Sequence, residues 1–479
     1  MIEIRKEVLL MRYFVLRCSI LLLLFISCAT AQQAGQASAA PDLNAIREET
    51  VQILAGLIKI DTSNPPGNET KAAQYIKVLL DREGIASEIV ESAPGRGSVI
   101  ARLKGSGKKK PLLLMGHIDV VGVEREKWSV DPFGGVIKDG FIYGRGASDD
   151  KGMVAANLAV LLQLHRSKLP LDRDVIYLAE AGEEGTTEYG MDFVVEKHWD
   201  KIAAEYAINE GGDFSLENGK LRYAGVSTTE KLPRGLRLVA RGSSGHGSMP
   251  RLDNPIVHLA AAVAKVGAWQ PPMRLNDTTH AFFARLATIS PSEEAQLYRN
   301  VERPEVQEKL RTTKIRFNSM LRTSISPNII RGGFRSNVIP AEAEAYLDVR
   351  ALPDEDIDAL IQTLRKLIDD PAVEVLRRPD VRQRPAAAPS SFDNEMFRAL
   401  ERAQQKVFAG SVTLPVMQVG ATDSAQLRAR GVQAYGISIP KAEEESRRVH
   451  GIDERISIDA LGKFVDYLWT AVVDVAAAK

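Results

Sequence analysis

The sequence predicts an α/β protein into which a smaller α+β domain is inserted. From about Asp42 onward, short apolar runs alternate with helical patterns, which is typical of a sheet covered by helices. Between about Glu230 and Arg384 the pattern changes to two strand–helix halves, as expected for a small α+β unit. The length of 479 residues is enough for two or three domains, each with its own core.

The composition is that of an ordinary folded chain. Hydrophobic residues make up 44% and charged residues 26%, which argues against a disordered or collagen-like protein. The 62 basic and 62 acidic side chains give a formal net charge of zero. Because there is also no long basic run, we expect no nucleic-acid partner.

The first 31 residues have the pattern of a secretory signal peptide. Arg12 and Arg17 precede an apolar run at 20–26, and Ala-Thr-Ala at 29–31 fits a small-x-small cleavage site. The apolar run is too short for a spanning helix of ~20 residues. We therefore expect a periplasmic or secreted protein, with a retained amphipathic anchor as the alternative.

Both cysteines, Cys18 and Cys28, lie in this segment. Phe-Ile-Ser-Cys at 25–28 also resembles an imperfect lipoprotein cleavage box, so a lipid anchor on Cys28 is a further expectation. Cleavage after Ala31 would instead leave no thiol in the mature chain. Any metal would then be held by histidines and carboxylates.

Five apolar runs are the predicted strands of the larger sheet, at 99–103, 112–115, 175–179, 206–208 and 432–439. Residues 153–164 are apolar nearly all round, which predicts a buried helix between the second and third strands. Residues 384–391 are rich in proline, alanine and serine, which predicts a linker.

The inserted region has its own periodicities. Apolar residues alternate at 236–240 and 343–349, which predicts strands with one buried face, and 373–375 predicts a short third strand. Helical spacing predicts helices at 254–269 and 357–368. About fifty residues between Trp269 and Met320 form an extra, mostly helical insertion to which the sequence assigns no role.

Polar clusters directly follow three of the predicted strands. Gly-His-Ile-Asp at 116–119 follows one strand, Glu183 and Glu184 follow another, and Asn-Glu-Gly-Gly at 209–212 follows a third. Open α/β sheets place their ligands at the carboxyl ends of strands. Adjacent glutamates are hard to explain by packing, because glutamate is seldom buried unpaired. The three clusters together predict a functional site.

Two further segments add candidate ligands. A glycine-rich loop at 144–152 carries Asp149 and Asp150, and residues 449–454 carry His450. The loop alone has a simpler interpretation, in which Asp149 or Asp150 caps the following helix. The combined set of two histidines and several carboxylates without sulfur suits zinc or a similar divalent ion. Its spare carboxylates suit two ions that share a bridging group.

These motifs resemble the series of the di-zinc amidohydrolase and exopeptidase family, which includes aminoacylase, carnosinase, glutamate carboxypeptidase, acetylornithine deacetylase and yeast carboxypeptidase S. The matching segments are 116–119, 143–152, 181–185, 209–211 and 450–451. They occur in family order within residues 45 to 475. Residues 128–135 and the enlarged insertion resemble the carboxypeptidase S branch most.

The resemblance implies a fold and a domain division. The catalytic domain would be a mixed sheet flanked by helices, built from residues 42–229 and 390–479. The inserted domain, residues 230–384, would be a ferredoxin-like lid that also mediates dimers. We call residues 230–384 the lid from here on.

The resemblance also implies roles for the clustered residues. His117 and Glu210 would bind one metal ion, Glu184 and His450 would bind the second, and Asp149 would bridge both. Asp119 would orient the imidazole of His117, and Glu183 would be the general base. The peptide bond after the bridging aspartate is often cis in the family, so a cis bond between Asp149 and Asp150 is implied.

Lid residues would complete the site. The segment 243–250 resembles the family's lid histidine motif, so His246 would contact the oxyanion, in the site of the neighbouring subunit if the protein is a homodimer. A turn histidine is the alternative. Asn337 and Arg350 match further lid motifs, and Arg350 could clamp a substrate carboxylate. Its alternative is a surface ion pair with Asp348.

One more motif lies in the second part of the catalytic domain. Residues 420–423 resemble the family's Gly-Gly-Thr-Asp turn, so Thr422 and Asp423 are expected near the substrate. Ala421 replaces the second glycine, which puts the exact backbone contacts in doubt.

The implied activity is hydrolysis of an amide bond in a small peptide or an N-acyl amino acid, with two Zn²⁺, or Co²⁺ or Mn²⁺, as cofactors. A dipeptidase or a desuccinylase of the same family is the alternative, although export argues against a desuccinylase that acts on cytosolic intermediates. An alternative of another class is a metal-bearing binding protein without catalysis. The presence of Glu183 argues against it, because a site that only binds metal would not need this second carboxylate.

Overall fold

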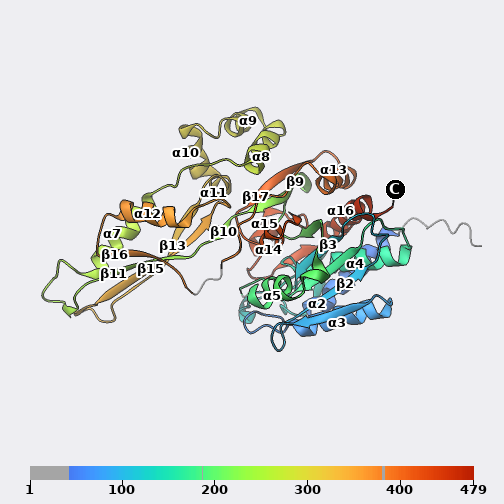
Figure 1. Ribbon diagram of the computed structural model, residues 1–479, viewed down its shortest axis with the longest axis horizontal. Coiled ribbons are helices and arrows are strands. Elements are labelled where there is room, and N and C mark those ends of the chain that lie inside the picture. Colours follow the sequence, from blue (N-terminus) through green and yellow to red (C-terminus); the bar gives the residue numbers. More distant parts are fainter. Residues whose placement is uncertain (1–41, 186, 380–382, 479) are drawn as a thin grey trace, which may run out of the picture.

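The computed structural model describes residues 42–185, 187–379 and 383–478 (Figure 1). The predicted signal segment 1–31 and Cys28 lie outside these residues. Within the described ranges, the structure contains no helix whose length and apolar character would suffice to cross a membrane.

The described residues contain a nine-stranded mixed sheet in the order β1-β2-β6-β3-β7-β18-β9-β17, with β8 paired to β9. Its strands are β1 (Ser87–Glu91), β2 (Gly97–Leu103), β3 (Leu112–His117), β6 (Val175–Glu180), β7 (Tyr206–Asn209), β8 (Asp213–Glu217), β9 (Lys220–Glu230), β17 (Val412–Gln418) and β18 (Gln433–Gly436). The central strands β6, β3, β7 and β18 run parallel, whereas β1 and β2 are antiparallel additions. This confirms the predicted fold class.

Helices cover both faces of this sheet. They are α2 (Leu43–Ile58), α3 (Glu69–Arg82), α4 (Lys151–Ser167), α5 (Met191–Lys197), α6 (Trp199–Ile202), α13 (Glu395–Val407), α14 (Ser424–Ala429) and α16 (Ile458–Ala476). A further helix, α15 (Glu443–Arg448), lies in the segment before His450. Leu112 and Leu114 of β3 pack with α2, α4 and α16, while Leu113 and Met115 pack with α5 and α14. Burial on both faces explains why the central strands are continuous apolar runs.

One predicted strand is shorter than expected. The run 432–439 forms a strand only over β18, and the following residues leave the ladder to pair with β8. The backbone N–H of Phe214 donates to the hydroxyl of Ser438, and the N–H of Lys441 donates to the carbonyl of Phe214. The apolar residues at 437 and 439 are buried in this crossing segment, which gave the run its strand-like appearance.

The lid has a separate sheet and a separate core. Its elements are β10 (Leu232–Pro233), β11 (Leu236–Arg241), β12 (Gly245–His246), α7 (Pro255–Ala268), β13 (Ser324–Gly332), β14 (Val338–Ile339), β15 (Glu342–Ala351), α12 (Ile357–Ile368) and β16 (Val373–Arg377). The antiparallel order β13-β15-β11-β16, with α7 and α12 packed on the sheet, is the ferredoxin-like arrangement. Figure 1 shows this sheet at the left, apart from the larger sheet at the right.

The extra insertion forms four helices, α8 (Asp277–Thr288), α9 (Ser292–Arg299), α10 (Pro304–Thr313) and α11 (Ile315–Met320). Phe282, Phe283 and Tyr298 form its core together with Leu414 and Val416 of β17. The insertion therefore covers the terminal strand of the large sheet. A strand at the end of a sheet leaves apolar surface and backbone groups open unless another element covers it.

A small third sheet positions one of the site loops. It consists of β4 (Val136–Lys138), β5 (Phe141–Tyr143) and β19 (Arg455–Ser457). Because β5 leads into the loop of Asp149 and β19 follows His450, the antiparallel pairing of β5 with β19 brings these two segments together.

Candidate metal centre

The polar clusters that follow the strands meet at one edge of the large sheet. β3 lies between β6 and β7 and is parallel to both, so the carboxyl ends of all three strands face the same way. His117 ends β3, Glu183 and Glu184 follow β6, and Glu210 follows β7. Parallel pairing thus assembles residues that are far apart in the sequence.

Two overlapping groups of side chains lie close enough to hold metal ions. The ligand atoms of His117, Asp149 and Glu184 all lie within 4.8 Å of one another, and so do those of His117, Glu183 and Glu210. The exposed ring of His450 joins the first group, with Nε2 2.9 Å from Oε1 of Glu184.

Asp149 has the geometry of a bridging carboxylate. Its Oδ1 lies 3.1 Å from Nε2 of His117, and its Oδ2 lies 3.1 Å from Nε2 of His450. The peptide bond between Asp149 and Asp150 is cis, as the family resemblance implied. Asp150 precedes α4 but makes no side-chain capping bond, so the structure does not support the simpler capping interpretation for it.

A buried ion pair fixes the loop that carries Asp149. Glu454 is fully buried, and its carboxylate accepts hydrogen bonds from the backbone N–H groups of Ser148 and Asp149 at 2.8 and 3.1 Å. Arg145 donates to the same carboxylate at 2.5 Å. Gly144 and Gly146 adopt positive φ angles of 158° and 84°, which side chains rarely tolerate. The two glycines therefore allow the backbone conformation of this loop.

Asp119 fixes the segment of the two glutamates as well as the histidine. Its carboxylate accepts from the backbone N–H groups of Glu183 and Glu184, each at 3.1 Å, and from the side-chain amide of Asn64 at 2.8 Å. Nδ1 of His117 lies 3.0 Å from the backbone oxygen of Asp119 and 3.4 Å from its carboxylate. The expected carboxylate contact is thus the longer of the two.

The charges at the site fit a pair of cations. Burial, followed by the charges of Asp149 and Glu183, raises the pKa of Glu210 well above its usual value. Hydrogen bonds with Asp149 and Glu184 raise the pKa of His450 to about 10. The crowded carboxylates therefore attract positive charge. The oxygen and imidazole donors suit zinc and similar divalent ions, so the residues fit the implied cofactor.

The lid residues do not reach this cluster in the structure. His246 is exposed, and its Nδ1 accepts from the backbone N–H of Ser248 at 3.1 Å. Asn337 is also exposed, and its backbone oxygen accepts from Gly247 at 2.8 Å. Among the described residues, neither belongs to a metal-binding group. Their roles toward a substrate stay predictions.

Arg350 forms an ion pair with Asp348, which was the alternative to its predicted role as a substrate clamp. Its Nε donates to the carboxylate of Asp348 at 3.0 Å, on the same strand β15. Somewhat more than a third of the Arg350 side chain is exposed, so the pair can exchange for another carboxylate. The substrate clamp stays a prediction.

The side chains of Thr422 and Asp423 are buried in the structure. The hydroxyl of Thr422 donates to Glu230 at 2.8 Å. Asp423 is fully buried and accepts from Arg384 at 2.9 Å. Both side chains are thus buried and paired, and their role toward a substrate stays a prediction.

Arg384 is the site residue that the sequence analysis missed. It lies in the predicted linker, and its Nη2 donates to Oε1 of Glu183 at 2.5 Å. A single arginine in a segment rich in proline and alanine gives no sequence signal, because its partners are distant along the chain.

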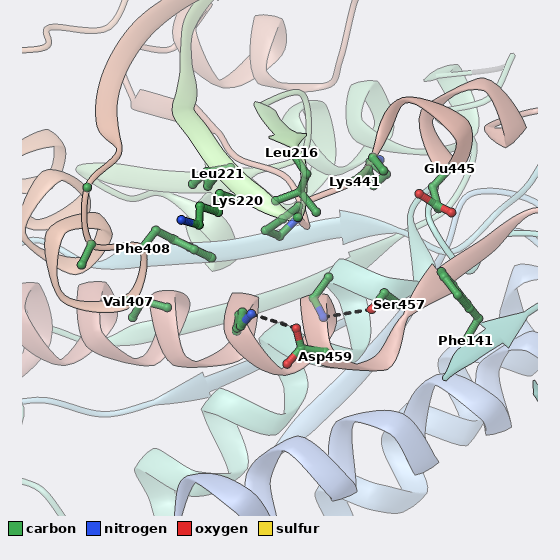
Figure 2. Close-up of a pocket in the computed structure, with 17 residues that line it drawn as sticks. Phe141, Leu216, Lys220, Leu221, Val407, Phe408, Lys441, Glu445, Ser457 and Asp459 are labelled. Atoms are coloured by element: carbon green, nitrogen blue, oxygen red, sulfur yellow. Dashed lines mark hydrogen bonds and ion pairs between the residues drawn. The ribbon is translucent and has the colours of Figure 1, made fainter. Parts of the chain in front are cut away.

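A cavity of about 690 Å³ lies outside the metal centre (Figure 2). Figure 2 shows it between the start of β9 at Leu221, the end of α13 beside Phe408 and the start of α16. Among the described residues, none of the predicted site residues lines it. One of its lining residues, Lys441, contacts the loop of Asp149, because its Nζ donates to the hydroxyl of Ser148 at 2.9 Å.

Curated relatives resemble this chain over most of its length. Human "N-fatty-acyl-amino acid synthase/hydrolase PM20D1" is 29% identical over 457 residues, covering 89% of this chain and 88% of that protein. "Probable carboxypeptidase S-like 2" of Dictyostelium discoideum is also 29% identical, covering 78% and 73%.

Solved structures share the fold at lower identity. The M20 family metallo-carboxypeptidase Sso-CP2 from Sulfolobus solfataricus superposes with a TM-score of 0.66 at 21% identity, covering 88% of this chain and 98% of that chain. Human carnosine dipeptidase 1 gives a TM-score of 0.64 at 18% identity, covering 90% and 97%.

The family assignment rests on most of the chain. The model of peptidase family M20/M25/M40 matches residues 113–474, which contain every candidate metal ligand. The chain therefore belongs to peptidase family M20/M25/M40, the family of metal-dependent amide hydrolases that its motifs resemble.

Proposed function

We propose that this protein hydrolyses the amide bond of N-acyl amino acids or the C-terminal amide bond of small peptides. Two divalent metal ions would be held by His117, Asp149, Glu184, Glu210 and His450. The names of the curated relatives, an N-fatty-acyl-amino acid synthase/hydrolase and a probable carboxypeptidase S-like protein, support this substrate class.

The position of Glu183 carries the proposal. This carboxylate lies beside His117 and Glu210 and is additional to the five proposed ligands. A carboxylate at this place can take a proton from an attacking water and later return it to the leaving amine, which typically contributes a factor of ~10²–10⁴. A site that only stored metal would not need it.

The other residues divide the remaining tasks. The two ions, when bound, would lower the pKa of a water molecule and polarise the amide carbonyl. Asp119 holds Glu183 and Glu184 in place through their backbone N–H groups. His246 would donate a hydrogen bond to the oxyanion, and Arg350 would exchange Asp348 for the carboxylate of the substrate.

We propose Zn²⁺ as the native metal, with Co²⁺ or Mn²⁺ as substitutes. The donor set of imidazole nitrogens and carboxylate oxygens suits all three, and the family forms dinuclear sites, as in the dinuclear metal-binding M20 peptidase YXEP of Bacillus subtilis. Elemental analysis of protein purified without added metal would identify the native metal. We expect two zinc atoms per chain.

A substrate panel tests the function. The mature chain from residue 32, loaded with zinc, is assayed against N-acyl amino acids with short and long acyl groups, dipeptides and N-succinyl-diaminopimelate. We expect turnover of N-acyl amino acids or peptides with a free carboxylate. Preference for dipeptides or for the succinyl compound would select the dipeptidase or the desuccinylase. No turnover of any compound by the zinc-loaded chain would support the non-catalytic alternative.

We further propose a homodimer formed through the lid. Exposed apolar side chains gather on its helix α7 and its terminal strand β13, including Val257, Ile330 and the nearby Phe334. A monomer rarely leaves such a patch and an open strand to water. Light scattering should give twice the chain mass for the wild type and the monomer mass for Val257→Glu with Ile330→Glu. A monomeric wild type at micromolar concentration would contradict the dimer.

We also propose export, with residues 1–31 removed as a signal peptide. The charged start, short apolar run and small-residue site at 29–31 support it. Expression of the full chain in a Gram-negative host, fractionation and N-terminal sequencing should give a periplasmic protein that starts at residue 32. Membrane-bound protein that a Cys28→Ala change releases would instead show the lipid anchor.

A further inference from the structure

The guanidinium of Arg384 lies between two carboxylates at the back of the metal centre. Its Nη2 donates to Oε1 of Glu183 at 2.5 Å, and its Nη1 donates to Oδ1 of Asp423 at 2.9 Å. The exposed fractions of the Arg384, Glu183 and Asp423 side chains are 10%, 11% and 0%. The three groups thus interact almost without water, where charged hydrogen bonds are strong.

The geometry of arginine limits the movement of Glu183. The planar guanidinium holds two partners in fixed directions, which a single ammonium group cannot do in the same way. With Oε1 of Glu183 held by Arg384, Oε2 is the oxygen without this bond. The carboxylate also lies with His117 and Glu210 within 4.8 Å. Arg384 therefore fixes a carboxylate that lies among the metal ligands.

Asp423 anchors the arginine from the opposite side. Its carboxylate is fully buried, and Asp423 directly precedes helix α14. The contacts therefore run from the start of α14 through Asp423 and Arg384 to Glu183. Because α14 packs on β3, a base held in this way is fixed to the sheet that also holds His117.

We propose that Arg384 is a positioning residue of the reaction: it fixes the carboxylate of Glu183 at the metal site, and Asp423 acts through it. The inference rests on the proposed role of Glu183 as the general base. Arg384 lies in the segment that leads from β16 of the lid to α13 of the catalytic domain. Its bond to Glu183 therefore connects this segment to the metal centre. Arg384 is not a metal ligand, so its loss should affect turnover without emptying the metal site.

The test compares Arg384→Ala, Arg384→Lys and a matched control in the zinc-loaded full mature chain. The control is Arg377→Ala, because Arg377 precedes the same return segment but pairs with Asp358 on the outside of the lid. We expect Arg384→Ala to lower kcat by roughly 10–100-fold with KM changed less than about threefold and two zinc atoms retained. Arg384→Lys should keep an intermediate kcat, and Arg377→Ala should equal the wild type.

Added guanidinium distinguishes a positioning role of Arg384 from a general loss of structure in the variant. Arg384→Ala leaves a gap of the shape of a guanidinium ion between two carboxylates. Millimolar guanidinium chloride should therefore restore part of kcat in this variant, but should not raise kcat in Arg384→Lys or Arg377→Ala. Asp423→Asn, which keeps the shape but loses the charge, should give a smaller loss of kcat. It also serves as the second variant if Arg384→Ala does not fold.

The outcomes distinguish this inference from the proposed function. An inactive wild type would reject both. An active wild type with unchanged kcat in Arg384→Ala would reject only the positioning role. A loss confined to KM would place Arg384 at the substrate instead, and a loss of kcat in Arg384→Ala and Asp423→Asn that follows loss of zinc, without rescue by guanidinium, would reduce both residues to a structural role.

Discussion

The carboxylate of Asp149 lies 3.1 Å from the imidazole of His450, although the two residues belong to the two separate sequence segments of the catalytic domain. Asp149 belongs to the loop before α4, and His450 to the turn before β19. They meet only when both parts of this domain have folded together. A metal ion held between them is therefore linked to the stability of the whole domain.

Removal of the metal ions should abolish hydrolysis and lower the melting temperature. Without cations, the carboxylates of Asp149, Glu184 and Glu210 repel one another at short range. We expect dialysis against a chelator to reduce both quantities and two equivalents of zinc per chain to restore them. Calorimetry and a hydrolysis assay measure the two effects on the same sample. Full activity in excess chelator would remove the metal from the mechanism.

Glu183→Gln should retain both zinc atoms and lose most turnover. The amide oxygen of glutamine can still accept a hydrogen bond from Arg384, but the amide cannot take a proton from water. The expected loss of kcat is a factor of ~10²–10⁴. The control is Glu196→Gln, an exposed glutamate on α5 outside the site. Unchanged turnover in Glu183→Gln would show that another group is the base.

His246→Ala should lower kcat more than substrate affinity. If the lid histidine donates to the oxyanion, its loss costs transition-state stabilisation, typically a factor of ~10²–10³ in kcat. His280→Ala is the matched control, because His280 is an exposed histidine on α8, within the insertion. An effect on KM alone would contradict the oxyanion role.

Much of the centre was predictable because each ligand sits next to a strong local pattern. The apolar runs of β3, β6 and β7 are unambiguous, and polar residues at their carboxyl ends have few structural explanations. His117, Glu183 and Glu210 could therefore be placed at one edge from the sequence. The inward-facing residues of the lid strands were visible for the same reason, since they alternate with a period of two.

The sequence could not predict contacts between loops, because loops have no periodic pattern of apolar residues. The pairing of Arg384 with Glu183, and of Thr422 with Glu230, joins loops whose partners lie far away in the chain. The motif at 420–423 therefore gave no indication that Thr422 pairs with Glu230 and Asp423 with Arg384. The insertion at 269–320 likewise has no local signal for the strand β17 that it covers.

A buried lysine at the start of the lid should make stability depend on pH. Lys231 is fully buried, and its Nζ donates to the backbone oxygen of Ser319 at 3.0 Å and to the hydroxyl of Ser324 at 2.6 Å. Burial, together with the charge of Arg350 and against that of Asp348, lowers its pKa from 10.5 to about 7. The folded protein thus loses this proton at a lower pH than the unfolded chain does.

The sign follows from the proton count. Between pH 7 and 10.5 the unfolded chain binds a proton on Lys231 that the folded protein has released, so the free energy of unfolding rises with pH. The slope from one such group is at most about 1.4 kcal/mol per pH unit. Other groups titrate as well, but Lys231→Met removes only this one. Urea unfolding of both proteins is measured at pH 7.5, 8.5 and 9.5. The free energy of unfolding of the wild type, minus that of Lys231→Met, should increase with pH. A difference that stays constant or shrinks with pH would mean that Lys231 keeps its proton inside the fold.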